Sequence, residues 1–205
     1  MKECDERVHI SIGNHFSACH QNAKIAAAEV GNVYVVDSQS ISTGSGHVVL
    51  NAALMAHKGM EAEEIVRELE VLIPKVEASF VLSNLKYMHL GGRCSGITAL
   101  GANLLKLNPR IDVVSGKMDV GKKFRGAFDK VILQYVEDKL TGRDDIEPAR
   151  IFVTNSPGTS AELIDRVVEK VKLLYNFDEI ICNEAGCVIS NHCGPNCLGI
   201  LFIRK

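Results

Sequence analysis

Tryptophan is absent from this 205-residue chain, and aromatic residues make up only 5% of it. The hydrophobic fraction of 46% is nevertheless that of an ordinary globular protein. A chain of this length can bury roughly 70% of its unfolded surface, which suffices for one large core or two modest lobes. We therefore expect a folded protein whose core consists mainly of aliphatic side chains.

Long hydrophobic runs are also missing, since none approaches the ~20 residues that a membrane-spanning helix needs. The first residues, MKECDERVHISIG, are charged and contain no apolar stretch of the kind found in secretory signals. We expect a cytoplasmic protein that makes at most transient contact with membranes.

Several catalytic signatures do not occur in the sequence. There is no G-x-S-x-G elbow, no G-x-x-x-x-G-K-[ST] loop and no G-x-G-x-x-G after a strand. The few aromatic residues are not interleaved with basic ones, as they are in proteins that stack single-stranded nucleic acid. We therefore predict a protein that is not an enzyme, needs no cofactor and has no nucleic acid partner.

The chain has 7 cysteines, four of them in its last 24 residues, without the framework spacing of a small secreted domain. We expect reduced and mostly buried thiols. A zinc-binding module built on Cys187, His192, Cys193 and Cys197 is an alternative, but structural zinc sites favour paired C-x2-C or H-x3-H units. We therefore predict no metal site.

Strands and helices alternate through the first 82 residues, a pattern typical of a parallel, doubly wound sheet. The strands expected there are 8–12, 33–36 and 79–82, and the helices are 17–29, 43–58 and 61–72. Residues 83–205 combine a hairpin, turning at Ser115-Gly116, with further α/β units. Their expected helices are 84–90, 96–107, 127–140 and 160–175, and their strands are 110–114, 117–120, 150–154, 179–182, 187–190 and 198–203. We predict an α/β protein with two lobes, residues 1–82 with a mostly parallel sheet and residues 83–205 with a mixed sheet.

A first candidate site follows the strand at residues 8–12, where Asn14 and Ser17 precede a helix. Ligands collect at the carboxyl ends of strands in open α/β sheets, and the amino end of a helix favours an anion such as a carboxylate. The alternative is that Asn14 or Ser17 only caps the helix, because both residue types are preferred there.

Two further candidate sites lie in the second lobe. His192 belongs to a turn, Asn191 to Asn196, whose imidazole could donate a hydrogen bond to a carboxylate or only cap nearby carbonyls. Arg93, which follows two glycines, and Arg125 carry planar guanidinium groups that can bind a carboxylate or phosphate through two hydrogen bonds. The alternative is that both are solvated surface charges. Residues 86–130 carry nine Lys or Arg against three Asp, so this stretch suits an anionic ligand or an acidic protein surface.

Three segments match one set of motifs in the same order along the chain. Residues 10–23, ISIGNHFSACHQNA, are similar to I-S-x-S-S-x-L-S-G-T-Y-Q-S-A. Residues 85–93, LKYMHLGGR, resemble L-x-Y-L-x-x-G-G-R, and residues 192–199, HCGPNCLG, resemble H-x-G-P-G-A-L-G. With this ordered series the chain resembles the DegV family of bacterial fatty-acid-binding proteins.

This resemblance implies a two-lobed carrier that buries one long-chain fatty acid. The carrier presents the carboxylate to a separate fatty acid kinase, which makes the acyl phosphate. By position, Ser17 and His192 match the residues that hold the carboxylate, with Asn14 beside them. Arg93 and Arg125 match basic positions that serve the kinase encounter or the phosphorylated head group.

The chain also departs from the family pattern. Gly13-Asn14 replaces Ser-Ser, and Asn196 replaces a glycine. Family members usually begin with a further α/β stretch carrying T-S-Q-P-S, so the first lobe is expected to be truncated at its N-terminus, as a fragment or a short form. The sequence leaves two rival hypotheses open: a phosphotransfer domain phosphorylated on His192 or His20, and a folded remnant that binds nothing.

Overall fold

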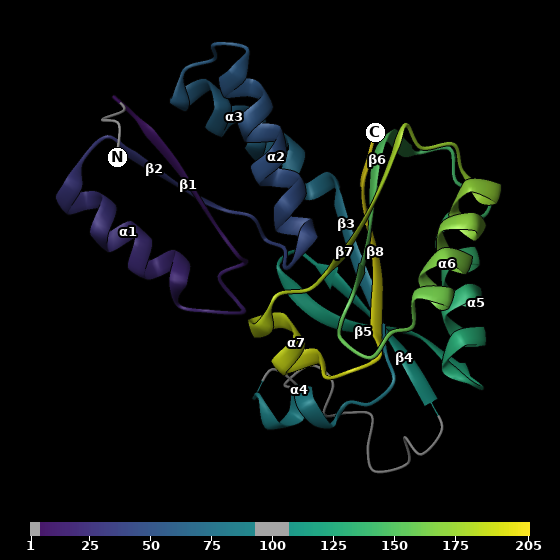
Figure 1. Ribbon diagram of the computed structural model, residues 1–205. Helices are drawn as coiled ribbons and strands as arrows, with labels where there is room; N and C mark the ends of the chain where they lie inside the picture. The colour runs from purple at the N-terminus through teal and green to yellow at the C-terminus, as the bar shows by residue number, and fades with distance from the viewer. Residues whose placement is uncertain (1–4, 93–106) are drawn as a thin grey trace. The chain divides into compact units, whose positions relative to one another are not determined.

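The computed structural model describes residues 5–92 and 107–205 and shows an α/β protein (Figure 1). The chain divides into two compact units, Met1–Glu77 with Ser115–Lys117 and Ala78–Val114 with Met118–Lys205. This division falls earlier than the domain boundary expected between residues 82 and 83, because most of β3 (Val76–Leu82) belongs to the sheet of the second unit. The domain boundary between residues 82 and 83 stays a prediction.

The third strand expected in the first lobe, residues 79–82, lies instead in the six-stranded sheet of the second unit. The first unit contains a two-stranded sheet, whose parallel pairing the sequence pattern predicted. Its strands are β1 (Arg7–Ser11) and β2 (Val33–Asp37), with Arg7 opposite Val33 and Ser11 opposite Asp37. Its helices are α1 (Cys19–Val30), α2 (Thr43–His57) and α3 (Ala62–Leu72), followed by a 3-10 turn at Ile73–Lys75. Apolar side chains of β2, α2 and α3 form its core, for example Val36, Val48 and Leu69.

The second unit contains a six-stranded sheet in the order β5-β4-β3-β8-β6-β7. Its remaining strands are β4 (Leu107–Val114), β5 (Lys117–Arg125), β6 (Ile146–Asn155), β7 (Glu179–Glu184) and β8 (Cys197–Arg204). Its helices are α4 (Lys86–Leu90), α5 (Phe128–Leu140), α6 (Ala161–Leu174) and α7 (Cys187–Cys193). β6 pairs parallel with β7 and antiparallel with β8, so the predicted mixed sheet is confirmed.

The two faces of this sheet differ in what covers them. Helices α5 and α6 lie side by side along one face, where they enclose the main core with Ile151, Val153 and Phe202 (Figure 1). Because side chains alternate along a strand, Phe152 and Leu201 point to the opposite face. They form a second apolar cluster there with Ala78.

The predicted hairpin is present, and its turn explains why it forms. β4 and β5 are neighbours in the sheet and are joined by two residues, Ser115 and Gly116, with φ of 48° and 75°. Positive φ at both central residues is the signature of a type I′ turn, whose twist matches that of the paired strands.

Two expected elements of the second lobe differ from the structure. The strand predicted at residues 187–190 is wrong, because this segment lies in α7, which is stopped by Gly194 at φ 74°. The helix predicted at residues 96–107 lies outside the described residues up to position 106, and Leu107 begins β4. Within the described ranges, none of the helices combines the length and the apolar character needed to span a bilayer.

Candidate functional site

His192 lies in the last turn of α7 in the second unit, and not in a turn between two strands as expected. The Gly194 N–H donates to the Ser190 carbonyl at 2.8 Å and closes the helix. Glycine fits this position because its backbone, with φ of 74° and ψ of −177°, has a conformation essentially confined to glycine. The turn fixes His192 at the junction between α7 and the start of β8.

Two segments that are far apart in the sequence meet at this junction. A side chain at Gly91 would place its Cβ 2.2 Å from His192 Nδ1, so the imidazole packs directly on the backbone at the end of α4. In the same way, a Cβ at Gly194 would lie 2.2 Å from the Tyr87 ring. The described part of the first motif, residues 85–92, and the motif at 192–199 therefore form one site, which the sequence patterns did not reveal.

A third segment, the loop after β6, holds the junction in place. The buried Ser156 hydroxyl donates to the Gly194 carbonyl at 2.7 Å and accepts the Cys197 N–H at 3.0 Å. The Asn196 N–H donates to the Pro157 carbonyl, and the Ser83 N–H donates to the Asn196 carbonyl. Sequence reasoning overlooked Ser156, although the Ser-Pro-Gly run after a strand was a signal for a structured turn.

The Nδ1 atom of His192 is fully buried and has no hydrogen-bond partner among the described residues. The side chain as a whole is only half-buried, so its accessible surface lies elsewhere on the ring. Since Nδ1 is enclosed, Nε2 is the ring nitrogen left to meet a ligand, and a neutral imidazole with its hydrogen on Nε2 can donate there. In that tautomer His192 offers Nε2–H as a donor to an acceptor such as a carboxylate.

An apolar cluster adjoins this polar junction. It contains Leu82, Met88, Ile111, Cys193 and Cys197, with partly buried side chains packed around them. Methionine adapts its shape easily, so a cluster containing Met88 can rearrange around an apolar guest. The second unit therefore places a hydrogen-bond donor next to aliphatic side chains.

In the first unit, the loops after β1 and β2 come together at the carboxyl ends of the two strands. The Gly13 N–H donates to the Ser40 carbonyl at 2.8 Å, and the Ser38 N–H donates to the Ser11 carbonyl at 3.2 Å. The Ser40 hydroxyl is buried and has no hydrogen-bond partner within the described part of the chain. Ser40 was not singled out from the sequence, although it follows a predicted strand in a Ser-rich run.

Asn14 is exposed in this loop, and its N–H donates to Asp37 Oδ1 at 3.2 Å. The same carboxylate oxygen accepts the Gln39 N–H at 2.9 Å. An anion bound at Asn14 would need its backbone N–H, but that N–H already donates to the Asp37 carboxylate. The negative charge of Asp37 would also repel the anion.

Ser17 is half-buried just before α1, and its hydroxyl makes local contacts. The oxygen accepts the Cys19 N–H at 3.2 Å and lies 3.0 Å from Cys19 Sγ. This is a local turn bond to the first N–H of α1; the N-cap residue itself is Ala18, and no side chain makes a capping hydrogen bond there, so the helix-capping alternative for Ser17 is wrong in its strict form. Because a thiol sulfur is a weak acceptor, the hydroxyl proton could turn to a stronger acceptor at little cost.

The two arginines cannot be treated alike. Arg125 is exposed at the end of β5, while Arg93 lies outside the described residues. Part of the basic stretch is neutralised internally, because Arg110 Nη1 donates to Asp138 Oδ2 at 2.6 Å and Lys122 pairs with the same carboxylate. The positive charge available to a partner is therefore smaller than the count along residues 86–130 suggested.

The described residues contain no group of three or more His, Cys, Asp or Glu side chains placed to hold a metal ion. His20, the other candidate phosphate acceptor, lies in the first unit with its Nδ1 3.1 Å from the Ser11 hydroxyl.

Comparison with known proteins agrees with the resemblance seen in the sequence. A DegV domain-containing protein from Clostridium acetobutylicum is 31% identical over 207 residues, which cover 98% of this chain and 71% of that protein. A DegV family protein from Thermus thermophilus, whose structure is described as showing fatty acid binding, matches with a TM-score of 0.84 and 28% identity over 100% of this chain and 72% of that one.

The Fatty Acid Kinase B3 protein of Streptococcus pneumoniae, solved loaded with linoleic acid, has a TM-score of 0.85. It is 18% identical, with 100% of this chain and 73% of that one covered, so this likeness concerns the fold. The family model described as "Uncharacterised protein, DegV family" matches residues 1–205. Because that match spans the whole sequence, this protein belongs to the DegV family.

Proposed function

We propose that this chain binds one long-chain fatty acid and acts as a carrier, not as a catalyst. In this proposal His192 and Ser17 are each candidate hydrogen-bond donors to the carboxylate, and a separate fatty acid kinase converts the carboxylate to the acyl phosphate. The supporting observation is the His192 junction, where a donor on Nε2 adjoins an aliphatic cluster.

The physical balance favours a ligand that is apolar apart from one charged group. Burying a sixteen-carbon chain contributes roughly 12 kcal/mol gross. Association costs about 4–15 kcal/mol, so nearly all of the chain must be enclosed for useful affinity. A bare carboxylate in such a place would cost several kcal/mol, and hydrogen bonds from an imidazole and a hydroxyl offset that cost.

The carboxylate assignment is tested by substituting each proposed donor. His192→Ala and Ser17→Ala are each expected to lower the amount of fatty acid retained through purification, because each removes one hydrogen bond to a buried charge. Retention is measured by organic extraction of the purified protein and quantitative lipid mass spectrometry, normalised to protein concentration.

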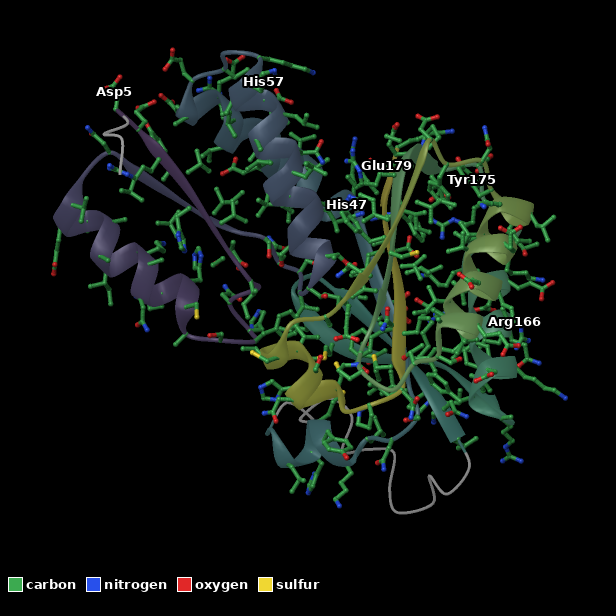
Figure 2. All side chains as sticks on the ribbon, in the orientation of Figure 1. Asp5, His47, His57, Arg166, Tyr175 and Glu179 are labelled. Carbon is green, nitrogen blue, oxygen red and sulfur yellow. The ribbon has the colours of Figure 1, made fainter. Side chains whose placement is uncertain are left out.

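Two matched variants control for general effects of substitution. His57→Ala removes an exposed histidine at the end of α2, which Figure 2 labels, and should leave retention unchanged. Ser17→Thr keeps the hydroxyl and should retain more lipid than Ser17→Ala. Wild-type retention in both His192→Ala and Ser17→Ala would refute the carboxylate assignment, and absence of lipid from the wild-type protein after growth with fatty acid would refute the carrier function.

A further inference from the structure

Two cysteines flank the connection between α7 and β8. Cys193 is the last residue of α7 and Cys197 is the first residue of β8, with only Gly194, Pro195 and Asn196 between them. Both side chains are almost fully buried, at 8% and 6% exposure, and both belong to the same apolar cluster. The family pattern that the sequence resembles has alanine at position 197, so the pair is a feature of this chain.

The backbone of this connection folds back on itself. Gly194 and Asn196 both have positive φ, of 74° and 56°. The Ser156 hydroxyl holds both ends of the loop, since it bonds the Gly194 carbonyl and the Cys197 N–H at once. This closure keeps the residues on either side of the loop close together.

The two thiols are also hydrogen-bonded to each other. The hydrogen bond from Cys197 lowers the pKa of the Cys193 thiol. The same bond, together with burial, raises the pKa of Cys197 well above the usual range. Cys193 is therefore the better nucleophile of the two, and Cys197 holds its proton beside it.

We propose that Cys193 and Cys197 form a reversible disulfide when the protein meets a peroxide. The Cys193 thiolate attacks one peroxide oxygen, the O–O bond breaks, and Cys193 becomes a sulfenic acid, while the other oxygen leaves as hydroxide and takes up the proton that the Cys193 thiol had released, giving water. The Cys197 sulfur then attacks Cys193 sulfur, the S–S bond forms and the S–O bond breaks. The Cys197 proton leaves with the hydroxide as a second water. Two thiols are oxidised and one peroxide is reduced to two waters.

The remaining described cysteines provide the contrast. Cys19, Cys182 and Cys187 are exposed. Although the Cys182 residue is exposed, partial desolvation of its thiol raises its pKa, which makes it a poorer nucleophile at neutral pH. Exposed thiols of this kind should take up an alkylating reagent after peroxide treatment, whereas the paired thiols should not.

The test uses the full chain carrying Cys182→Ser and Cys187→Ser. In this variant the tryptic peptide of residues 173–204 contains only Cys193 and Cys197, because no Lys or Arg lies between positions 172 and 204. After hydrogen peroxide, alkylation with N-ethylmaleimide under denaturing conditions and digestion, this peptide should carry no alkyl group and weigh two hydrogen atoms less than the dithiol. Dithiothreitol before alkylation should restore two alkylated sites.

Further measurements can overturn the proposal. Alkylation of both cysteines after peroxide treatment, a mass gain from sulfinic acid, or a disulfide to another cysteine would each contradict it. A third substitution, Cys197→Ala, should abolish the mass loss without disturbing the fold, since alanine is small and apolar. The readout needs no bound lipid, so its failure and the failure of the carrier function are distinguishable.

Discussion

At the scale of single residues, the environment of His192 depends on a residue that has no side chain. The imidazole rests on Gly91, and Gly91 itself has an ordinary right-handed backbone with φ −77°. An alanine would fit that backbone without strain, so the only obstacle to a side chain at position 91 is contact with the imidazole and its surroundings.

Gly91→Ala is therefore expected to displace the imidazole and lower fatty acid retention several-fold. Its cost in the free energy of unfolding should be about 1–3 kcal/mol, the usual range for overpacking. Lipid mass spectrometry measures the first effect and urea denaturation the second.

Gly186→Ala, at the N-cap of α7, is the control for this substitution. Gly186 has open space around an added Cβ and a negative φ, so the change should alter stability by less than about 1 kcal/mol and leave retention intact. Equal retention in Gly91→Ala and Gly186→Ala would show that His192 does not need its present position.

The importance of Gly91 was only half visible in the sequence. The resemblance at residues 85–93 marked the two glycines, and the tail motif marked His192. Contact between them depends on the packing of α4 against α7, which neither periodicity nor spacing reports. Ser156 was missed for the same reason, since its role is to bond two backbone groups of a distant loop.

At the scale of secondary-structure elements, the central strands are joined by a side chain. The Tyr135 hydroxyl, from α5, donates to the Ser79 carbonyl on β3 at 2.8 Å and accepts the Ile200 N–H of β8 at 2.9 Å. It also accepts from the Ser79 hydroxyl at 2.9 Å. Burial raises the pKa of Tyr135 far above that of an exposed phenol, so the group stays neutral.

Tyr135→Phe should lower the free energy of unfolding by about 2–5 kcal/mol, because it leaves buried polar groups without partners. Urea denaturation followed by circular dichroism measures the change. Tyr175→Phe is the matched control, since its hydroxyl, at the end of α6 (Figure 2), donates one bond, to the Ile146 carbonyl at the start of β6, and the loss of that bond should cost about 1 kcal/mol. Equal effects of the two substitutions would contradict the bridging role of Tyr135.

For most segments, the sequence predicted correctly whether a helix or a strand forms, because the local residue pattern and the tertiary packing favour the same structure. The hairpin turn at Ser115-Gly116 is an example, since its backbone requirement is local. Helix α7 is the exception: its Val188 and Ile189 favour a strand, but Gly194 ends a helix and Cys193 packs into the apolar cluster. The glycine was the correct signal and the β-branched pair was the misleading one.

At the scale of the whole molecule, the proposed function requires a second protein. Arg125 is exposed at the end of β5, where a basic side chain can contact an acidic partner or a phosphorylated head group. In an assay with ATP and a fatty acid kinase, Arg125→Ala should lower the rate of acyl phosphate formation by several-fold. Trapping with hydroxylamine measures that product.

Arg166→Ala on α6, an exposed residue labelled in Figure 2, is the control for that assay. Both variants should retain wild-type amounts of fatty acid, because neither residue is assigned to the carboxylate. If Arg125→Ala supports the wild-type rate, Arg125 has no part in the kinase encounter.

The order of strands in the second sheet bears on when the proposed binding site is complete. β8 follows every other strand of its sheet in the sequence, yet it lies between β3 and β6. The contact of His192 with Gly91 closes a loop of about a hundred residues, and such long-range contacts form slowly. During synthesis, the sheet stays split and the imidazole unsupported until this segment has left the ribosome. Under the proposed function, a bound lipid would therefore report that β8 has joined its sheet.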